Sequence, residues 1–123
     1  MYLSIVIPTY NEEKNIRQSL AKIFDYLDSK EFSSEVIVVD DGSTDETVEI
    51  INEFYGEREN IELIENQHKG KGVAVRTGVL ASEGDYVLFS DADLATPIEE
   101  AERFLMWLKD QDFGVAIVSR EGF

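Results

Sequence analysis

The sequence predicts an α/β fold in three layers, with helices on both faces of a mostly parallel β-sheet. Apolar runs of strand length alternate along the chain with amphipathic stretches of helix length, and polar turn residues separate them. Such alternation favours right-handed crossover connections, which bring the strands into parallel alignment. A chain of 123 residues without a repeat or an internal linker forms one domain. We therefore expect five strands and four helices in a single domain.

The first strand–helix–strand unit is predicted by changes in the spacing of apolar residues. Residues 3–7 form an apolar run that Pro8 ends, and residues 13–29 carry apolar side chains at helical spacing. The next apolar run, at residues 36–39, predicts the second strand.

The second unit begins with a helix-start pattern. Ser43 and Glu46 have the spacing of a capping box, which predicts a helix that runs through Tyr55. Residues 61–64 predict a short third strand, and glycines precede a third helix over about residues 72–82.

The last unit contains the fourth and fifth strands. Residues 86–89 predict the fourth strand, and residues 114–118 predict the fifth. Between them, Thr96 and Pro97 are typical of a helix start, because threonine caps a helix and proline fits its first position. That helix is expected to end near residue 110. Either the fifth strand is the last element, or the sequence is the front part of a longer protein.

Composition excludes several classes of protein. The chain has no cysteine, which excludes disulfides, thiolate zinc sites and a cysteine nucleophile. Its formal net charge of -15 argues against a nucleic-acid partner and against broad attraction to an anionic membrane surface, though not against local docking. No apolar run reaches the ~18 residues of a membrane-spanning helix, and no signal-peptide pattern begins the sequence. We expect a soluble, cytoplasmic chain.

Two acidic clusters follow two of the apolar runs directly. Residues 36–39 lead into Asp40 and Asp41, and residues 86–89 lead through a serine into Asp91 and Asp93. In a parallel α/β sheet, ligands bind beyond the carboxyl ends of the strands. Carboxylates gathered there repel one another unless a cation or a donor-rich ligand offsets their charge. The clusters predict a site for a divalent metal and an anionic ligand, most simply a nucleotide diphosphate.

Each cluster also has a simpler interpretation. Asp91 and Asp93 hold one hard cation together, or share a metal and a sugar hydroxyl, or are acids of a solvated turn. Asp40 and Asp41 accept hydrogen bonds from a base or a ribose, or belong to a helix start in which Ser43 is the cap. The helix-start interpretation accounts for Ser43 and leaves the two aspartates unexplained.

A basic cluster and a polar segment are further candidates. The cluster is the stretch from His68 to Gly72, which includes Lys71, together with Arg76. Glycines before a helix let backbone N–H groups approach a phosphate, although a solvated loop is the alternative. The Walker pattern is absent, and His68 has no companion ligand that would indicate a catalytic or zinc role. The polar residues 8–13 after the first strand either line the same crevice or cap the first helix.

Four segments together resemble family two of the glycosyltransferases, the inverting class with the Rossmann-like GT-A fold. They are Ile5–Glu12, Val38–Asp45, Gly70–Gly72 and Ser90–Asp93. The resemblance implies a nucleotide-sugar donor and Mg²⁺ or Mn²⁺ as the cofactor. The implied donor-binding residues are Pro8, Tyr10, Glu12, Asp40 or Asp41, Lys71, Asp91 and Arg120, and the implied metal ligands are Asp91 and Asp93.

The subgroup follows from residues 70–76 together with residues 91–96, which are similar to those of dolichyl-phosphate glucosyltransferases. Ala95 and Thr96 stand where the related mannose synthases usually carry glutamine and histidine. This favours UDP-glucose as donor. It also implies a dolichyl or polyprenyl phosphate acceptor and a peripheral position on the cytoplasmic membrane face.

The same resemblance makes residues 1–123 the nucleotide-sugar-binding part of a longer domain. Family members continue further, into a region that supplies the acceptor site and the general base, so no catalytic base is assigned in this chain. A non-catalytic nucleotide-sugar-binding fragment is the main alternative. Phosphoryl transfer through a D-x-D-x-[TV] nucleophile is disfavoured, because Ala95 occupies the last position and the motif follows the fourth strand. The sequence gives no indication of an oligomeric state.

Overall fold

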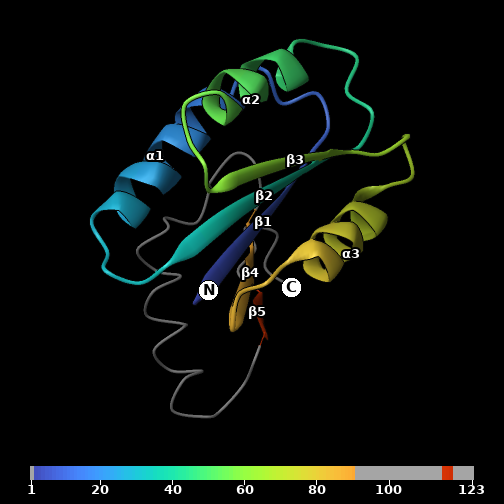
Figure 1. Ribbon diagram of the computed structural model, residues 1–123. Coiled ribbons are helices and arrows are strands. Elements are labelled where there is room, and N and C mark those ends of the chain that lie inside the picture. Colours follow the sequence, from blue (N-terminus) through green and yellow to red (C-terminus); the bar gives the residue numbers. More distant parts are fainter. Residues whose placement is uncertain (1, 91–114, 118–123) are drawn as a thin grey trace.

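Five parallel strands form one sheet in the order β3-β2-β1-β4-β5 (Figure 1). The structure, a computed structural model, describes residues 2–90 and the backbone of residues 115–117. In chain order the elements are β1 (Leu3–Thr9), α1 (Ile16–Asp28), β2 (Ser34–Asp40), α2 (Thr47–Tyr55), β3 (Ile61–Glu65), α3 (Lys71–Ala81), β4 (Tyr86–Phe89) and β5 (Val115–Ile117). The predicted parallel α/β fold and its five strands are confirmed. The helix predicted between Thr96 and residue 110 lies outside the described residues.

Helices cover both faces of the sheet, as the three-layer prediction requires. Helices α1 and α2 lie on one face and α3 lies on the other (Figure 1). Alternate residues of β1 divide between the two cores: Ile5 and Ile7 pack in the α1–α2 cluster, and Val6 packs in the α3 cluster with Ala74. This division follows from the two-residue period of a strand, and it explains why β1 is apolar on both sides.

Strand β1 continues through Pro8 to Thr9, two residues beyond the predicted last residue, Ile7. Val6 accepts a hydrogen bond from the Ser90 N–H on the β4 side, and Thr9 accepts one from the Asp41 N–H on the β2 side. By this alternation the backbone nitrogen of Pro8 faces β4, whose pairing with β1 ends at Val6. Proline therefore removes no ladder hydrogen bond at this position, and pairing with β2 carries β1 to Thr9.

The capping box predicted from Ser43 and Glu46 is wrong. Helix α2 begins at Thr47, where the backbone N–H is bonded to Oδ1 of Asp45 at 2.9 Å. The Ser43 side chain is bonded instead to the buried carboxylate of Asp40, at 2.6 Å. Because Asp40, at the end of β2, binds the Ser43 side chain, Ser43 lies four residues before the helix and does not cap it. The spacing of Ser43 and Glu46 in the sequence therefore does not decide where the helix starts.

Helix α3 lies unusually close to the sheet at Gly78. A Cβ atom added at Gly78 would overlap Cγ1 of Val6 and would lie 3.2 Å from Cγ2 of Val39. The residue has to be glycine because β1 and β2 occupy the space that a side chain would need. This contact holds α3, and therefore its first residue Lys71, close to the sheet. Among the described residues, no helix combines the length and apolarity needed to cross a bilayer.

Gly78→Ala should lower the free energy of unfolding by about 1–3 kcal/mol, because the new methyl group overpacks the α3–sheet contact. Gly72→Ala in the first turn of the same helix is the matched control, since a Cβ there meets no atom within 4 Å. The control should be neutral or stabilising by up to ~1 kcal/mol through helix propensity. Urea unfolding followed by circular dichroism measures both, and equal effects of the two variants would contradict the packing argument.

Candidate functional site

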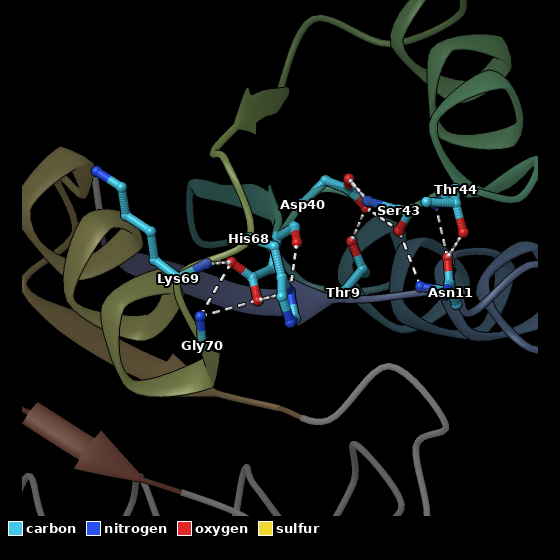
Figure 2. Close-up of polar contacts among 9 residues, drawn as sticks. Thr9, Asn11, Asp40, Ser43, Thr44, His68, Lys69 and Gly70 are labelled. Atoms are coloured by element: carbon cyan, nitrogen blue, oxygen red, sulfur yellow. Dashed lines mark hydrogen bonds and ion pairs between the residues drawn. The ribbon is translucent and has the colours of Figure 1, made fainter.

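The candidate site lies at the carboxyl edge of the sheet, where the strand order reverses. Strand β1 lies between β2 and β4, so the chain leaves β1 in one direction and returns to the other side of it with β4. Ligands of open α/β sheets bind at this kind of topological switch point. The segments after β1, β2 and β3 converge there, and their polar side chains form the networks drawn in Figure 2.

Asp40 ends β2 as a buried carboxylate that is only 1% exposed. It accepts hydrogen bonds from the Thr9 hydroxyl at 2.8 Å, the Ser43 N–H at 2.8 Å and the Ser43 hydroxyl at 2.6 Å (Figure 2). Three donors satisfy a carboxylate that would be costly to bury alone. Asp40 therefore fastens the end of β1 to the loop that follows β2.

The loop after β1 is tied to the loop after β2 by a second set of bonds. Asn11 donates its N–H to the Ser43 hydroxyl at 2.8 Å and accepts the Thr44 N–H on its side-chain oxygen at 2.8 Å (Figure 2). Its φ of 53° is left-handed, a conformation that asparagine adopts more readily than most residues. Glu12 donates its N–H to the Thr47 hydroxyl at 2.8 Å. These bonds fix the segment that carries Tyr10 and Glu12.

Asp41 is bound to the loop between β3 and α3. Its carboxylate is 4% exposed and accepts the backbone N–H of Lys69 at 2.7 Å and that of Gly70 at 3.0 Å. Nδ1 of His68 lies 3.0 Å from Oδ2 of the same carboxylate. Hydrogen bonding by the Lys69 N–H, helped by Gly70 and by the charge of His68, holds the pKa of Asp41 below its ordinary value, although burial opposes the shift. Asp41 is therefore an ionised acceptor at neutral pH.

An aromatic pair stands beside Asp41. The rings of Tyr10 and His68 are stacked, with centroids 4.4 Å apart and planes inclined by 29°. Tyr10 is 43% exposed and the His68 side chain is 62% exposed, so the pair borders solvent. An aromatic face next to an ionised carboxylate is suited to a planar heterocycle that carries an N–H donor.

Lys71 lies on the β4 side of the same edge. It is the first residue of α3, and its ammonium lies 5.2 Å from the centroid of the Phe89 ring at the end of β4. This distance is within the range of a cation–π contact. The predicted basic cluster therefore adjoins the end of the strand that leads to the second acidic cluster.

Among the described residues, the structure brings the predicted site residues to the same edge of the sheet. Pro8, Tyr10, Asp40, Asp41 and Lys71 share the carboxyl edge, and Glu12 follows in the loop fixed to α2. Asp91, Asp93 and Arg120 lie outside the described residues. Within residues 2–90, no three histidine or acidic side chains are grouped in a way that would hold a metal. The binding roles and the metal ligands stay predictions.

Sequence reasoning assigns no site role to the His68 side chain, and it names Thr9 and Asn11 only as part of the polar segment 8–13. His68 has no companion ligand in the sequence, yet the structure places it against Asp41 and Tyr10. Its position just after β3 is the signal that was available, because all parallel strands end at the same edge. Gly42 has a φ of 82°, and a Cβ added to it would lie 3.0 Å from the backbone nitrogen of His68. The loop after β2 and the loop after β3 therefore approach each other closely at this point.

Comparison with known sequences gives a family match over nearly the whole chain. The sequence profile of glycosyl transferase family 2 matches residues 4–123. A dolichyl-phosphate beta-glucosyltransferase of Dictyostelium discoideum is 34% identical, over 98% of this chain and 40% of its own length. The chain thus spans about two fifths of the length of this relative.

Two solved structures are similar to the described fold. A mannosyltransferase from Pyrobaculum calidifontis in complex with GDP-Man and Mn²⁺ aligns with a TM-score of 0.65 and 29% identity, covering 74% of this chain and 27% of that protein. S. aureus TarS 1-349 in complex with UDP-GlcNAc aligns with a TM-score of 0.64 and 31% identity, covering 87% of this chain and 32% of that protein.

Asp41→Asn should lower the free energy of unfolding near neutral pH, because the amide has fewer acceptor sites for the Lys69 and Gly70 N–H groups. The folded-state pKa of Asp41 lies below the unfolded value of about 3.9, so the carboxylate stabilises the fold above that pH. This stabilisation is lost as the pH falls through the folded-state pKa. The difference between wild type and variant should therefore be constant at higher pH and narrow below about pH 4.

Urea unfolding at a series of pH values measures this difference. Glu62→Gln, at an exposed position of β3, is the control for loss of a carboxylate. A gap between wild type and Asp41→Asn that stays constant down to the acid limit would contradict the lowered pKa.

Proposed function

The chain belongs to glycosyl transferase family 2, and from that premise we propose that residues 1–123 form the nucleotide-sugar-binding part of a metal-dependent, inverting glycosyltransferase. The observation that carries the proposal is that the Asp41 carboxylate and the Tyr10 ring both contact the His68 side chain at the carboxyl edge of the sheet. The family match and the similar GT-A structures support a donor site at this edge.

In this proposal Asp41 and Tyr10 recognise the base. Both carboxylates are buried, but one partner of Asp41 is the exposed His68 side chain, whereas the donors of Asp40 come from Thr9 and Ser43. We assign Asp40 the role of fixing the loops after β1 and β2, and Asp41 the role of accepting a base N–H. Pro8 and Glu12 are assigned to the donor site as part of the segment after β1, which the bond from Glu12 to α2 holds in place.

The donor diphosphate and the metal are proposed to lie on the β4 side. Chain geometry fits this placement: the Ser90 N–H is bonded to the Val6 carbonyl at 3.0 Å, so the chain leaves the sheet edge next to β1 just before Asp91. Carboxylate oxygens are suitable ligands for Mg²⁺ or Mn²⁺, and we assign this role to Asp91 and Asp93. When bound, such a metal offsets the negative charge of the leaving diphosphate. Lys71 and Arg120 are assigned to the phosphates.

The proposed donor is UDP-glucose and the proposed acceptor is a dolichyl or polyprenyl phosphate. The Dictyostelium relative is named a dolichyl-phosphate beta-glucosyltransferase, which supports glucose as the transferred sugar and dolichyl phosphate as the acceptor. The two solved structures hold GDP-Man and UDP-GlcNAc, so the fold accommodates more than one base and sugar. The acceptor oxygen displaces the nucleotide at C1 of the sugar with inversion. A phosphate acceptor is already anionic and needs little help from a general base, which we do not assign to any residue of this chain.

A lipid acceptor implies a peripheral position on the cytoplasmic face of a membrane. The chain has a net charge of -15, so broad electrostatic attraction to anionic lipids would not hold it at the membrane. Docking would therefore be local.

Asp93→Asn should remove most of the Mn²⁺-dependent thermal stabilisation by UDP, because an amide oxygen carries no charge to hold the metal. Asp85→Asn, at an exposed position before β4 and so at the opposite end of the sheet, is the matched control. A thermal-shift panel of UDP, GDP, UDP-glucose and GDP-mannose, each with and without Mn²⁺, measures both variants. Unchanged metal-dependent stabilisation in Asp93→Asn would remove the acid pair from the site.

A non-catalytic donor-binding fragment is the second candidate for this chain taken alone, favoured by its coverage of only 40% of the relative. We expect residues 1–123 to bind UDP with Mn²⁺ but to transfer little sugar to polyprenyl phosphate. Without the remaining part of such a relative, donor and acceptor are not held in attack geometry. Most of the ~7–11 kcal/mol by which proximity and orientation can lower the activation barrier is then absent. Transfer of radiolabelled glucose by this chain and by a longer protein that contains it separates the candidates. Comparable turnover by the two forms would show that the acceptor site lies within residues 1–123.

A further inference from the structure

The Asp41 carboxylate, which is proposed to bind the base, is covered by its own hydrogen-bond donors. Oδ1 of Asp41 accepts the Lys69 N–H at 2.7 Å and is 3.3 Å from the Gly70 nitrogen. Oδ2 accepts the Gly70 N–H at 3.0 Å and contacts Nδ1 of His68 at 3.0 Å. The carboxylate thus has three donors, one of which, the Gly70 N–H, is shared between its two oxygens. Because the Asp41 side chain is only 5% exposed, a base N–H can reach it only if one of the groups that cover it moves.

Only one of these donors is free to leave without disturbing the backbone. The donors from Lys69 and Gly70 are main-chain groups of the loop before α3, whereas the donor from His68 is a side chain that is 62% exposed. The His68 backbone is confined, because a Cβ on Gly42 would lie 3.0 Å from its nitrogen. Rotation of the imidazole ring alone is therefore the change that opens Asp41.

The imidazole makes the two contacts that a bound base would need. It stacks on Tyr10 with 4.4 Å between ring centroids, and it places a ring nitrogen 3.0 Å from Oδ2 of Asp41. A pyrimidine with an imide N–H, such as uracil, presents the same combination of a planar face and a ring donor. One exposed side chain thus covers both the aromatic face and the carboxylate.

We propose that the His68 ring occupies the place of the nucleobase before a nucleotide binds, and that the base displaces it from Tyr10 and Asp41. Moving the His68 ring away costs part of the binding free energy of the nucleotide. The site therefore favours bases that can replace the ring both on Tyr10 and at Asp41. This inference rests on the proposed function, since it requires a nucleotide site at Asp41. If the site is uncovered in only a fraction of the molecules, the apparent affinity for the nucleotide equals the intrinsic affinity multiplied by that fraction.

The first test compares UDP affinity, in the presence of Mn²⁺, for variants of the full chain by calorimetry. His68→Ala should bind UDP about two- to fivefold more tightly, which is the range expected for releasing one exposed contact to a carboxylate. Gln67→Ala, an exposed position in the same loop, is the control and should leave the affinity unchanged. Pyrophosphate carries no base, so its affinity should be the same for wild type and His68→Ala. Weaker or unchanged UDP binding by His68→Ala would overturn the proposal.

The second test observes the ring directly. His68 is the only histidine of the chain, so its imidazole nitrogens give one pair of signals in a ¹⁵N NMR spectrum. Saturating UDP should move these signals to the position of a solvent-exposed imidazole, whereas pyrophosphate should not. Ring signals that UDP leaves unchanged would overturn the proposal.

Asp41→Ala separates this inference from the proposed function. It should weaken UDP binding at least ~tenfold, since it removes the base acceptor itself. If it does so while His68→Ala gains no affinity, the displacement of His68 is wrong and the nucleotide site at Asp41 is retained. If Asp41→Ala binds UDP as tightly as wild type, both the base site at Asp41 and the displacement of His68 are wrong.

Discussion

Two consecutive buried carboxylates organise the carboxyl edge of this sheet. Successive residues of an extended chain point to opposite sides, so Asp40 and Asp41 are directed toward different neighbours. Asp40 accepts its hydrogen bonds from Thr9 and Ser43, and Asp41 accepts its hydrogen bonds from Lys69 and Gly70. Buried carboxylates need several donors, and here the loops that supply those donors are thereby fixed in position. The geometry of the site is a consequence of satisfying these two charges.

The packing of the sheet makes that arrangement possible. The apolar clusters on the two faces hold β1 and β2 in register, with Thr9 opposite Asp40. Helix α3 is drawn against the sheet at Gly78, which places its first turn beside the end of β4. The site therefore depends on packing on both faces of the sheet. The apolar residues fix the positions of the strands and of α3, and the polar residues at the edge then position the loops.

The sequence predicted the strands well because they are short, mostly apolar runs between polar turn residues, as expected for parallel strands covered by helices on both faces. Prediction failed where a distant partner decided the local structure. Ser43 has the pattern of a helix cap, but Asp40 binds its hydroxyl and the helix begins at Thr47. His68 looked isolated because its partners, Tyr10 and Asp41, are far away in the sequence. The acid pair Asp91 and Asp93 came from motif resemblance alone and lies outside the described residues.

The hydrogen bonds of this edge span long stretches of chain. Thr9 and Asp40 are separated by 31 residues, Asn11 and Thr44 by 33, and Asp41 and Lys69 by 28. Contacts of such range form only after the intervening segments have closed into place, so no fragment containing one strand and one loop can preform the site. A ligand held here therefore reports on completed folding of β1, β2 and β3 together. Its binding free energy stabilises all three against unfolding, and no single loop receives that stabilisation alone.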